Sequence, residues 1–352
     1  MAVIRKKTGN FLEDFRIGQV LRHKVGKTVN EGLVSAFTEF SMSTNPLHKN
    51  RRYAQAYGFR DTILPPGLVM AVVFSQSVED ISENARANLE YVDMRFGAAV
   101  HIGDTIESTS LVLGVTPSSR DPSLGVVHVQ TTGRNQHDDV VLTYERKVQV
   151  WKLDPAAEVV KAATVAPAVV CELVLPSYDA ALPYKTLRHL SNADTYFEDF
   201  TVGDTIEHSR GRTMTSEHIA LTAMLDNTSQ VHCNQYMIDQ NPERFVGGQL
   251  IIFGGIPFQL CLGLSSPDVA DNSLGDIAYK TGRHSAPLFA GDTVFASTEI
   301  TRKHDLLGRP DLGVVETILR GHKFVTKDGA SEKVDIFYLE RALAVKRRSH
   351  YA

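Results

Sequence analysis

Apolar and polar residues alternate in four consecutive stretches in the first half of the chain, and turn residues bound each stretch. Alternation with a period of two predicts β-strands that bury one face. Because the gaps between them are short, we expect consecutive antiparallel strands at ANLEYVDMRF (87–96), DTIESTSLVLGV (104–115), LGVVHVQTTGRN (124–135) and DVVLTYERKVQVW (139–151).

Two helices are predicted before these strands. The first carries an apolar stripe at near-helical spacing, formed by Leu33, Val34, Phe37 and Phe40. Asn30 precedes this stripe and is a residue type favoured at helix N-caps. A second, more apolar helix is predicted from about Gly67, where the two prolines at 65–66 suit a first turn. One apolar helix followed by a run of strands implies a sheet wrapped around that helix, so the predicted fold class is α+β.

The second half of the chain repeats the order of the first half. FLEDFRIGQVL (11–21) matches YFEDFTVGDTI (196–206), and the segment behind it matches with Thr215 as the expected N-cap. His48 in NPLH then matches His232 in SQVH, and Gly67 in LPPGLVM matches Gly248 in VGGQLI. VHIGDTIEST (100–109) matches LFAGDTVFAS (288–297), and TYERKVQVWK (143–152) matches YLERALAVKR (338–347). Because six matching segments stay in order, the sequence predicts one domain that is duplicated.

A segment rich in Ala, Val and Pro, PAAEVVKAATVAPAVV (155–170), separates the two copies. It lacks an amphipathic period, so we interpret it as the start of a linker that runs to about residue 190. The predicted domains are therefore 1–154 and 191–352, with the linker at 155–190. The alternative is a strand and loop packed on the first domain. A length of 352 residues suits two domains.

Charge and cysteine content exclude several classes of protein. Lys and Arg total 37 against 41 Asp and Glu, a net charge of −4, so neither nucleic acid nor membrane is an expected partner. Three cysteines in a long chain favour a reducing compartment over a disulfide framework. We find no stretch typical of a signal peptide, so we expect a cytoplasmic protein. The 13 histidines show no metal-ligand spacing, so no metal is expected.

The loop before the second helix carries the most specific motif, MSTNPLHKNRRYA (42–54). Together with FxDFxxG, the apolar helix and the strand–GDT–strand order, it resembles the MaoC-like, (R)-specific enoyl-CoA hydratase family. The family motif is roughly Gly-Asp-x-Asn-Pro-x-His followed by a small residue, which Asn45, His48 and Ala54 match. Ser43 stands where that family carries its catalytic Asp. In the second copy, LDNTSQVHCNQ (225–235), Asn227 stands in that position.

The second-copy loop and the opening GNFLEDFRIGQVL are most similar to the mesaconyl-CoA hydratase (β-methylmalyl-CoA dehydratase) branch of that family. The resemblance implies a double hot-dog, in which two tandem domains each wrap an antiparallel sheet around a central helix. It also implies an acyl-CoA substrate, no cofactor and a homodimer. The implied reaction is the reversible addition of water to a branched C5 enoyl-CoA such as mesaconyl-CoA. A thioesterase and a non-catalytic acyl-CoA-binding protein remain as alternatives.

Hydration of an unsaturated thioester needs a base for water, an acid for Cα and hydrogen-bond donors for the enolate oxygen. A histidine can act as the base, and a nearby carboxylate or amide can orient the water. We favour the second copy, because its loop offers Asp226 and Asn227 beside His232, with Gly248 for the enolate. The first copy offers the counterpart candidates His48, Asn45, Ser43 and Gly67.

Three arginines are candidate contacts for the substrate carboxylate or the CoA phosphates, because a guanidinium binds such groups in a bidentate fork. They are Arg51 and Arg52 behind the first histidine loop and Arg283 before the second GDT segment. The alternative for each is a solvated surface side chain. Glu340 and Arg341 are predicted to form a strand-face ion pair of small energetic value.

Overall fold

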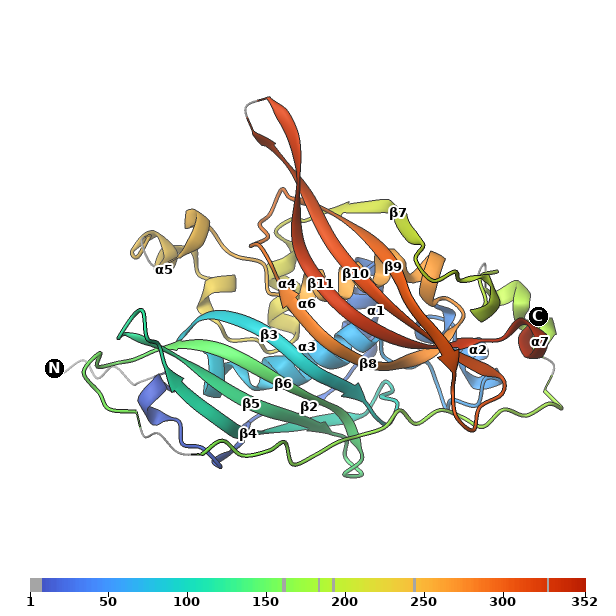
Figure 1. The fold of residues 1–352 in the computed structure, drawn as a ribbon, viewed down its shortest axis with the longest axis horizontal. Coiled ribbons are helices and arrows are strands. Elements are labelled where there is room, and N and C mark those ends of the chain that lie inside the picture. The colour runs from blue at the N-terminus through green and yellow to red at the C-terminus, as the bar shows by residue number, and fades with distance from the viewer. Residues whose placement is uncertain (1–7, 160–162, 183, 192–193, 243–244, 328) are drawn as a thin grey trace.

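An antiparallel sheet runs through the whole molecule (Figure 1). The computed structural model describes residues 8–159, 163–182, 184–191, 194–242, 245–327 and 329–352. In these residues the sheet has 11 strands in the order β1-β4-β5-β6-β3-β8-β11-β10-β9-β7, and β2 pairs with β4 beside this path. The predicted α+β class is confirmed.

The first repeat forms one half of this sheet. Its strands are β1 Val20–Arg22, β2 Lys27–Thr28, β3 Ala85–Phe96, β4 Thr105–Pro117, β5 Leu124–Arg134 and β6 Val140–Trp151. Its helices are α1 Glu31–Phe40, α2 Arg51–Ala56 and α3 Pro66–Gln76. The four strands predicted from alternation are confirmed within a few residues. Asn30 caps α1 as predicted, since its side chain accepts a hydrogen bond from the Leu33 amide at 2.9 Å.

The second repeat forms the other half. Its strands are β7 Thr205–Thr213, β8 Ser273–His284, β9 Thr293–Asp305, β10 Leu312–Lys327 and β11 Ala330–Lys346. Its helices are α4 Glu217–Met224, α5 Gln235–Asp239, α6 Gly255–Ser265 and the terminal α7 Arg348–Tyr351. The N-cap prediction is wrong here: Ser216 precedes α4, and its side chain makes no capping bond. Thr215 lies one residue earlier and makes only a long contact, 3.5 Å, with the Glu217 amide.

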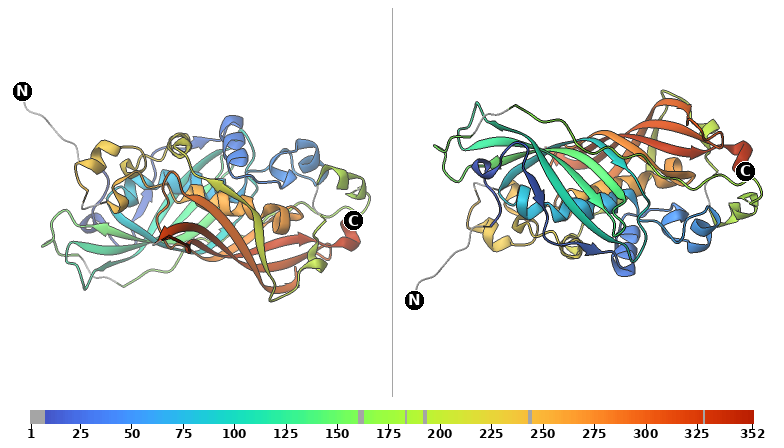
Figure 2. Two further views of the ribbon diagram at one scale, coloured as in Figure 1. Left: turned by 90° about the horizontal axis from the view of Figure 1, so that it is seen from above. Right: turned by 90° about the horizontal axis from the view of Figure 1, so that it is seen from below.

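Helices α3 and α6 lie at the centre of the fold, each in the concave face of its own half-sheet (Figures 1 and 2). Both are mostly apolar and almost completely buried, because the sheet covers one side and neighbouring helices cover the others. The two helices contact each other closely: a Cβ on Gly67 of α3 would lie 2.4 Å from Gln259 Oε1 of α6. Their burial unites the two repeats in one hydrophobic core.

Strands β3 and β8 join the half-sheets, with Tyr91 opposite Gly282 and Arg95 opposite Ala278. Each is the strand that follows the central helix of its repeat, so the junction is pseudo-symmetric. The same register holds in both copies, because Tyr91 pairs with Arg146 and Tyr279 pairs with Arg341. Residues of one copy can therefore be matched to residues of the other by position in the strands.

The described part of the segment between the repeats lies along the first half-sheet. The Val165 amide donates to Leu113 O, the Gln130 side chain bonds to residues 168–169, and the Val174 amide donates to Gly97 O. Residues 163–182 form no regular helix or strand. Leu173 and its neighbours thereby come to lie over the groove between the two repeats, where they help to cover the site described below.

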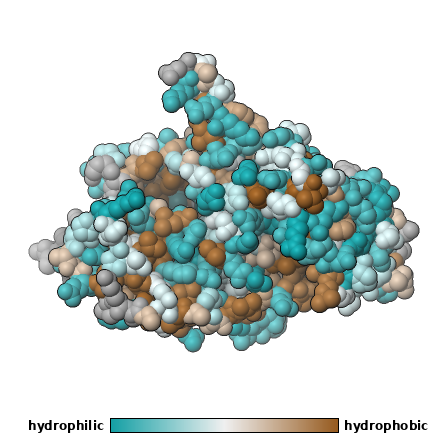
Figure 3. All heavy atoms as spheres, viewed as in Figure 1, coloured by the Kyte–Doolittle hydropathy of each residue, from teal (hydrophilic) through white to brown (hydrophobic). Residues whose placement is uncertain are grey.

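The surface mixes polar and apolar residues (Figure 3). The β10–β11 hairpin projects beyond the body of the molecule in this view and in Figure 1, and Phe324 on it is half exposed. Among the described residues, no helix is long and apolar enough to cross a membrane.

Candidate active site

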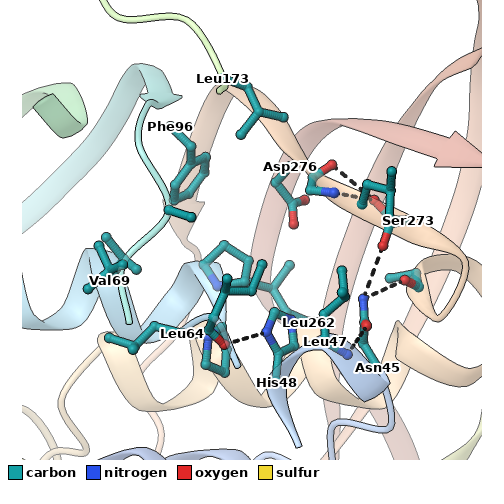
Figure 4. Close-up of a pocket in the computed structure, with 18 of the residues that line it drawn as sticks. Asn45, Leu47, His48, Leu64, Val69, Phe96, Leu173, Leu262, Ser273 and Asp276 are labelled. Carbon is teal, nitrogen blue, oxygen red and sulfur yellow. Dashed lines mark hydrogen bonds between the residues drawn. The ribbon is translucent and has the colours of Figure 1, made fainter. Parts of the chain in front are cut away.

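A cavity of about 70 Å³ lies between the two repeats (Figure 4). By the same measure a single water molecule needs roughly 10–15 Å³, so the space exceeds what one water requires. The first repeat contributes the histidine loop at 43–48, the N-terminus of α3 and residues 96–100. The second contributes the end of α6, the start of β8 and Arg341, while residues 173–175 cover it. Both copies are thus needed to form this one cavity.

The first histidine loop is fixed to the opposite repeat by Asn45. Its side-chain oxygen accepts from the Leu47 amide at 3.0 Å, which caps the short turn Pro46–His48. Its side-chain nitrogen donates to Ala270 O at 2.9 Å, and its backbone amide donates to Ser266 Oγ at 3.1 Å. Asn45 is buried, so these bonds hold the loop in place against the second repeat.

His48 ends that turn with its ring at the cavity wall. Its Nδ1 is 2.9 Å from the carbonyl oxygen of Ile63. Because a carbonyl only accepts, Nδ1 carries the proton and Nε2 keeps its lone pair. Burial is the main reason that the pKa of His48 is lowered to about 4. The ring is therefore neutral near pH 7, with Nε2 available to take a proton.

His232 has the same local geometry in the second copy, but it does not line this cavity. Its Nδ1 is 2.8 Å from Ile251 O, and burial lowers its pKa to about 4 as well. The Phe253 ring centroid is 5.6 Å from the centroid of its imidazole. By its position after Ile251, Phe253 occupies the place that Pro65 has after Ile63. A large ring thus stands in the second copy at the position equivalent to part of the cavity wall in the first.

Among the described residues, neither of the polar side chains predicted to assist His232 is hydrogen-bonded to its ring. The Asp226 carboxylate is half exposed and forms an ion pair with Lys27. Asp226 has φ +58 and Met42 has φ +57, so both occupy the position of the motif's glycine rather than of its aspartate. Asn227 accepts from the Ser229 amide at 3.0 Å, and its Nδ2 has no partner among the described residues. Ser43, the equivalent of Asn227, is buried and lines the cavity.

The expected pairing of Gly67 with Gly248 needs correction. Gly67 lies in the first turn of α3, next to the cavity-lining Pro66, but Gly248 is exposed in a loop well before α6. The Leu64 amide donates to Val100 O, and the Ile252 amide makes the equivalent bond to Leu288 O in the second copy. Gly67 and Gly255 each lie three residues after these amides, so Gly255 is the counterpart of Gly67. The sequence comparison failed because the second loop is longer, and a VGG string falls inside the extra residues.

The three predicted arginines lie outside the cavity. Arg51 donates from Nε to Asp61 at 2.8 Å on the surface, and Arg52 is exposed beside it. Arg283 is exposed and stacks over the Tyr338 ring, with 4.1 Å between the guanidinium carbon and the ring centroid. None of the three is among the residues that line the cavity.

Two site residues that the sequence interpretation missed are Asp276 and Arg341. Asp276 on β8 and Arg341 on β11 form a buried, bidentate ion pair at the cavity wall. The predicted Glu340–Arg341 pair is wrong, because adjacent strand residues face opposite sides of a sheet. Glu340 instead lies near Lys280 on the outer face, at 3.8 Å. A charged residue among apolar ones in SLGDIAY was the signal available in the sequence.

The described residues contain no cluster of three or more His, Cys, Asp or Glu side chains that could hold a metal ion. The side chains available for chemistry at the cavity are therefore the histidine, the Asp276–Arg341 pair and a few hydroxyl and amide groups. They can transfer protons, orient water and donate hydrogen bonds.

Comparison with known proteins agrees with this fold and site. Residues 2–322 match the family described as mesaconyl-CoA hydratase. A β-methylmalyl-CoA dehydratase from Chloroflexus aurantiacus is 39% identical over 91% of this chain and 89% of that protein. A mesaconyl-CoA hydratase from Cereibacter sphaeroides is 32% identical over 97% of both. The crystal structure of a MaoC domain protein from Chloroflexus aurantiacus superposes with a TM-score of 0.87 at 33% identity, covering 98% of this chain and 100% of that one.

The fold and the site together define a MaoC-like double hot-dog protein, as the sequence predicted. A Mycobacterium tuberculosis protein described as a double hot-dog shares the fold at 20% identity, with a TM-score of 0.76 over 96% of this chain and 99% of that one. Within this class, the chain belongs to the mesaconyl-CoA hydratase family. It is a hydro-lyase of the enoyl-CoA hydratase type.

Proposed function

We propose that this chain adds water reversibly to the double bond of a branched C5 enoyl-CoA, mesaconyl-CoA, in the cavity beside His48. The observation that carries the proposal is the position of His48: a neutral imidazole, with Nε2 unbonded among the described residues, at the wall of a cavity closed by both repeats. The sequence favoured His232, whose loop offered more polar residues. We now favour His48 instead, because it lines the cavity and His232 does not.

In this mechanism His48 acts as the base. Water bound in the cavity attacks Cβ, and Nε2 takes one of its protons. The resulting imidazolium then delivers that proton to Cα, so one hydrogen and one hydroxyl are added across the double bond. The Nδ1–H bond to Ile63 O keeps the ring oriented during both transfers. The lowered pKa favours return of the proton, since the buried ring is more stable when neutral.

The N-terminus of α3 lies at the same cavity and can stabilise the enolate oxygen that develops on the thioester. The first amides of a helix have no partners inside the helix and lie at its positive end. Pro66 has no N–H, so the Gly67 amide is the first one available in α3. Among the described residues, no hydrogen bond from the Gly67 amide to a loop or turn competes for it.

The choice of mesaconyl-CoA is supported by the names of the two relatives at 39% and 32% identity. The cavity suits a small branched acyl group, since its lining is mainly apolar. Its branched aliphatic residues are Leu47, Ile63, Leu64, Val69, Val100, Val141, Leu173, Val174, Leu175, Leu262 and Leu274. Arg51, Arg52 and Arg283 remain candidates for the CoA phosphates, which extend outside an acyl pocket.

A mass-spectrometric screen of purified protein against branched and straight enoyl-CoAs tests this proposal. We expect a gain of one water on mesaconyl-CoA and slower turnover of crotonyl-CoA, together with loss of the enoyl-thioester absorbance. No change in any enoyl-CoA would contradict hydration. Release of free thiol, measured in the same reaction, would indicate the thioesterase alternative. Calorimetric binding without turnover would indicate an acyl-CoA-binding protein.

Three further expectations belong to the same proposal: no cofactor, a cytoplasmic location and a homodimer. The family resemblance supports the dimer, and the half-exposed Phe324 on the projecting hairpin offers it an apolar contact. We expect light scattering to give twice the 38.8 kDa chain mass, and we expect activity to survive dialysis against a chelator.

A further inference from the structure

Neither histidine loop carries the aspartate of the family motif, so a hydratase of this family needs its carboxylate from elsewhere. Asp276 is the carboxylate that lines the cavity together with His48. It comes from β8 of the second repeat, whereas His48 comes from the loop of the first. Figure 4 shows the Asp276 side chain extending from β8 into the cavity, across from the wall that holds the His48 ring.

We propose that Asp276 is a catalytic residue that replaces the missing loop aspartate and orients the attacking water from the opposite repeat. This inference rests on the proposed hydratase function at His48. The water would donate one hydrogen to His48 Nε2 and the other to an Asp276 oxygen, which aims an oxygen lone pair at Cβ. The first hydrogen passes to Nε2 and then to Cα, and the second stays on the new hydroxyl group.

Arg341 holds this carboxylate in place. Its Nε donates to Oδ1 and its Nη2 donates to Oδ2 at 3.1 Å, while Nη1 lies 3.3 Å from Ser265 Oγ. Each carboxylate oxygen has a second lone pair, so the bidentate pair leaves acceptor capacity for water. Both side chains are almost fully buried, so the pair is not solvated from outside. Arg341 thus acts as a positioning residue.

The second pseudo-symmetric position shows that the fold does not require this carboxylate. Arg146 is the counterpart of Arg341, because Arg146 pairs with Tyr91 and Arg341 pairs with Tyr279. Asn88 is the counterpart of Asp276, because each lies three residues before the tyrosine of its own strand. Arg146 is fully buried without a carboxylate partner among the described residues: Nη2 donates to Ser77 Oγ at 3.1 Å, and Nε and Nη1 have no partner. Of these two equivalent positions, only the one beside the cavity carries an acid.

The test compares two reactions of the full-length chain. The first is hydration of mesaconyl-CoA. The second is exchange of deuterium from solvent into Cα of the saturated butyryl-CoA, which uses His48 but needs no oriented water. For Asp276→Asn we expect a hydration kcat about a hundredfold lower. The side-chain oxygen of Asn must accept from Arg341, so its NH₂ group, a donor, faces the water in place of a carboxylate oxygen. We expect exchange to stay within about threefold of wild type, because His48 is untouched.

Three variants complete the design. Asp276→Glu keeps the charge and the ion pair but moves the carboxylate by one methylene, so a loss of about tenfold or more in hydration is expected without unfolding. Ser43→Asp in the Asp276→Asn background restores an acid at the loop position. The double variant should have a hydration kcat at least tenfold higher than that of Asp276→Asn alone. Asn88→Asp, the matched control, should hydrate like wild type.

The outcomes separate this inference from the proposed function. Wild type that hydrates no enoyl-CoA refutes the proposed function itself. Wild type that hydrates, with Asp276→Asn and Asp276→Glu at normal kcat, overturns only the role of Asp276. Parallel loss of hydration and exchange in Asp276→Glu, with an unchanged melting temperature, also overturns it, because the residue would then act on His48 or on the thioester rather than on water.

Discussion

The carboxylate of Asp276 accepts two hydrogen bonds from the guanidinium of Arg341 inside the sheet, at the wall of the cavity that also contains His48. The two residues lie on β8 and β11 of the second repeat, and the histidine belongs to the first. The duplication therefore has a chemical consequence: the site that the first repeat begins is completed by the second.

The pH dependence of turnover should reflect the buried state of His48. Its pKa is lowered from 6.5 to about 4, chiefly by burial. As a base it must be neutral, so kcat/KM should stay level from pH 8 to about pH 5.5 and fall only as the pH approaches 4. A pH–rate profile with mesaconyl-CoA measures this directly. An acidic limb centred near pH 6.5 would mean that the working histidine is solvated.

Gly67 should not tolerate a side chain. A Cβ at this position would lie 2.4 Å from Gln259 Oε1 and 2.9 Å from Gln259 Cβ. Overpacking of this kind costs about 1–3 kcal/mol, so Gly67→Ala should lower the free energy of unfolding by that amount in a urea titration. Adding Gln259→Ala should recover part of the loss. Gly32→Ala on the exposed face of α1 is the milder comparison. Its Cβ would lie 3.3 Å from Asn30 Oδ1 and near no other atom, so a smaller loss than for Gly67→Ala is expected.

Lys346 should make stability depend on pH. Its ammonium group is buried, bonds to the Tyr53 hydroxyl and lies 4.0 Å from the Tyr57 ring centroid. Burial lowers its pKa to about 7, below the value near 10.5 of an unfolded lysine. Between these values the unfolded chain binds the extra proton, so raising the pH from 6 to 9 stabilises the fold, by about 2–3 kcal/mol at most.

Lys346→Met isolates this contribution. The variant lacks the titrating group, so its stability relative to wild type should be most favourable at pH 6 and should decline toward pH 9. Urea unfolding at the two pH values gives the comparison. If wild type and variant differ in the free energy of unfolding by the same amount at pH 6 and pH 9, folding does not lower the pKa of Lys346.

Much of the fold follows from the sequence because its signals are local. The alternation in residues 87–151 and the apolar run behind Pro66 specify strands and a central helix from residues close together in the chain. Asn30 caps its helix for the same reason. The repeat itself could be identified because both copies keep short motifs with turn glycines.

The site was less predictable because it is formed by contacts far apart in sequence. The position of Gly248 depends on where a loop insertion falls, which one sequence does not define. The exposure of Asp226 depends on the left-handed backbone at its position and on Lys27 from the other repeat. Asp276 reaches the cavity only because β3 and β8 join the two half-sheets. No local pattern in SLGDIAY encodes that junction.

The most direct test of the account is the hydration rate of mesaconyl-CoA for His48→Gln and His232→Gln, measured side by side from the loss of enoyl-thioester absorbance. The two histidines share the same backbone contact, so each variant controls for the structural cost of the other. We predict that His48→Gln lowers kcat by about 10²–10⁴-fold and that His232→Gln stays within a few-fold of wild type. The reverse order would place the working site in the second copy and contradict the account.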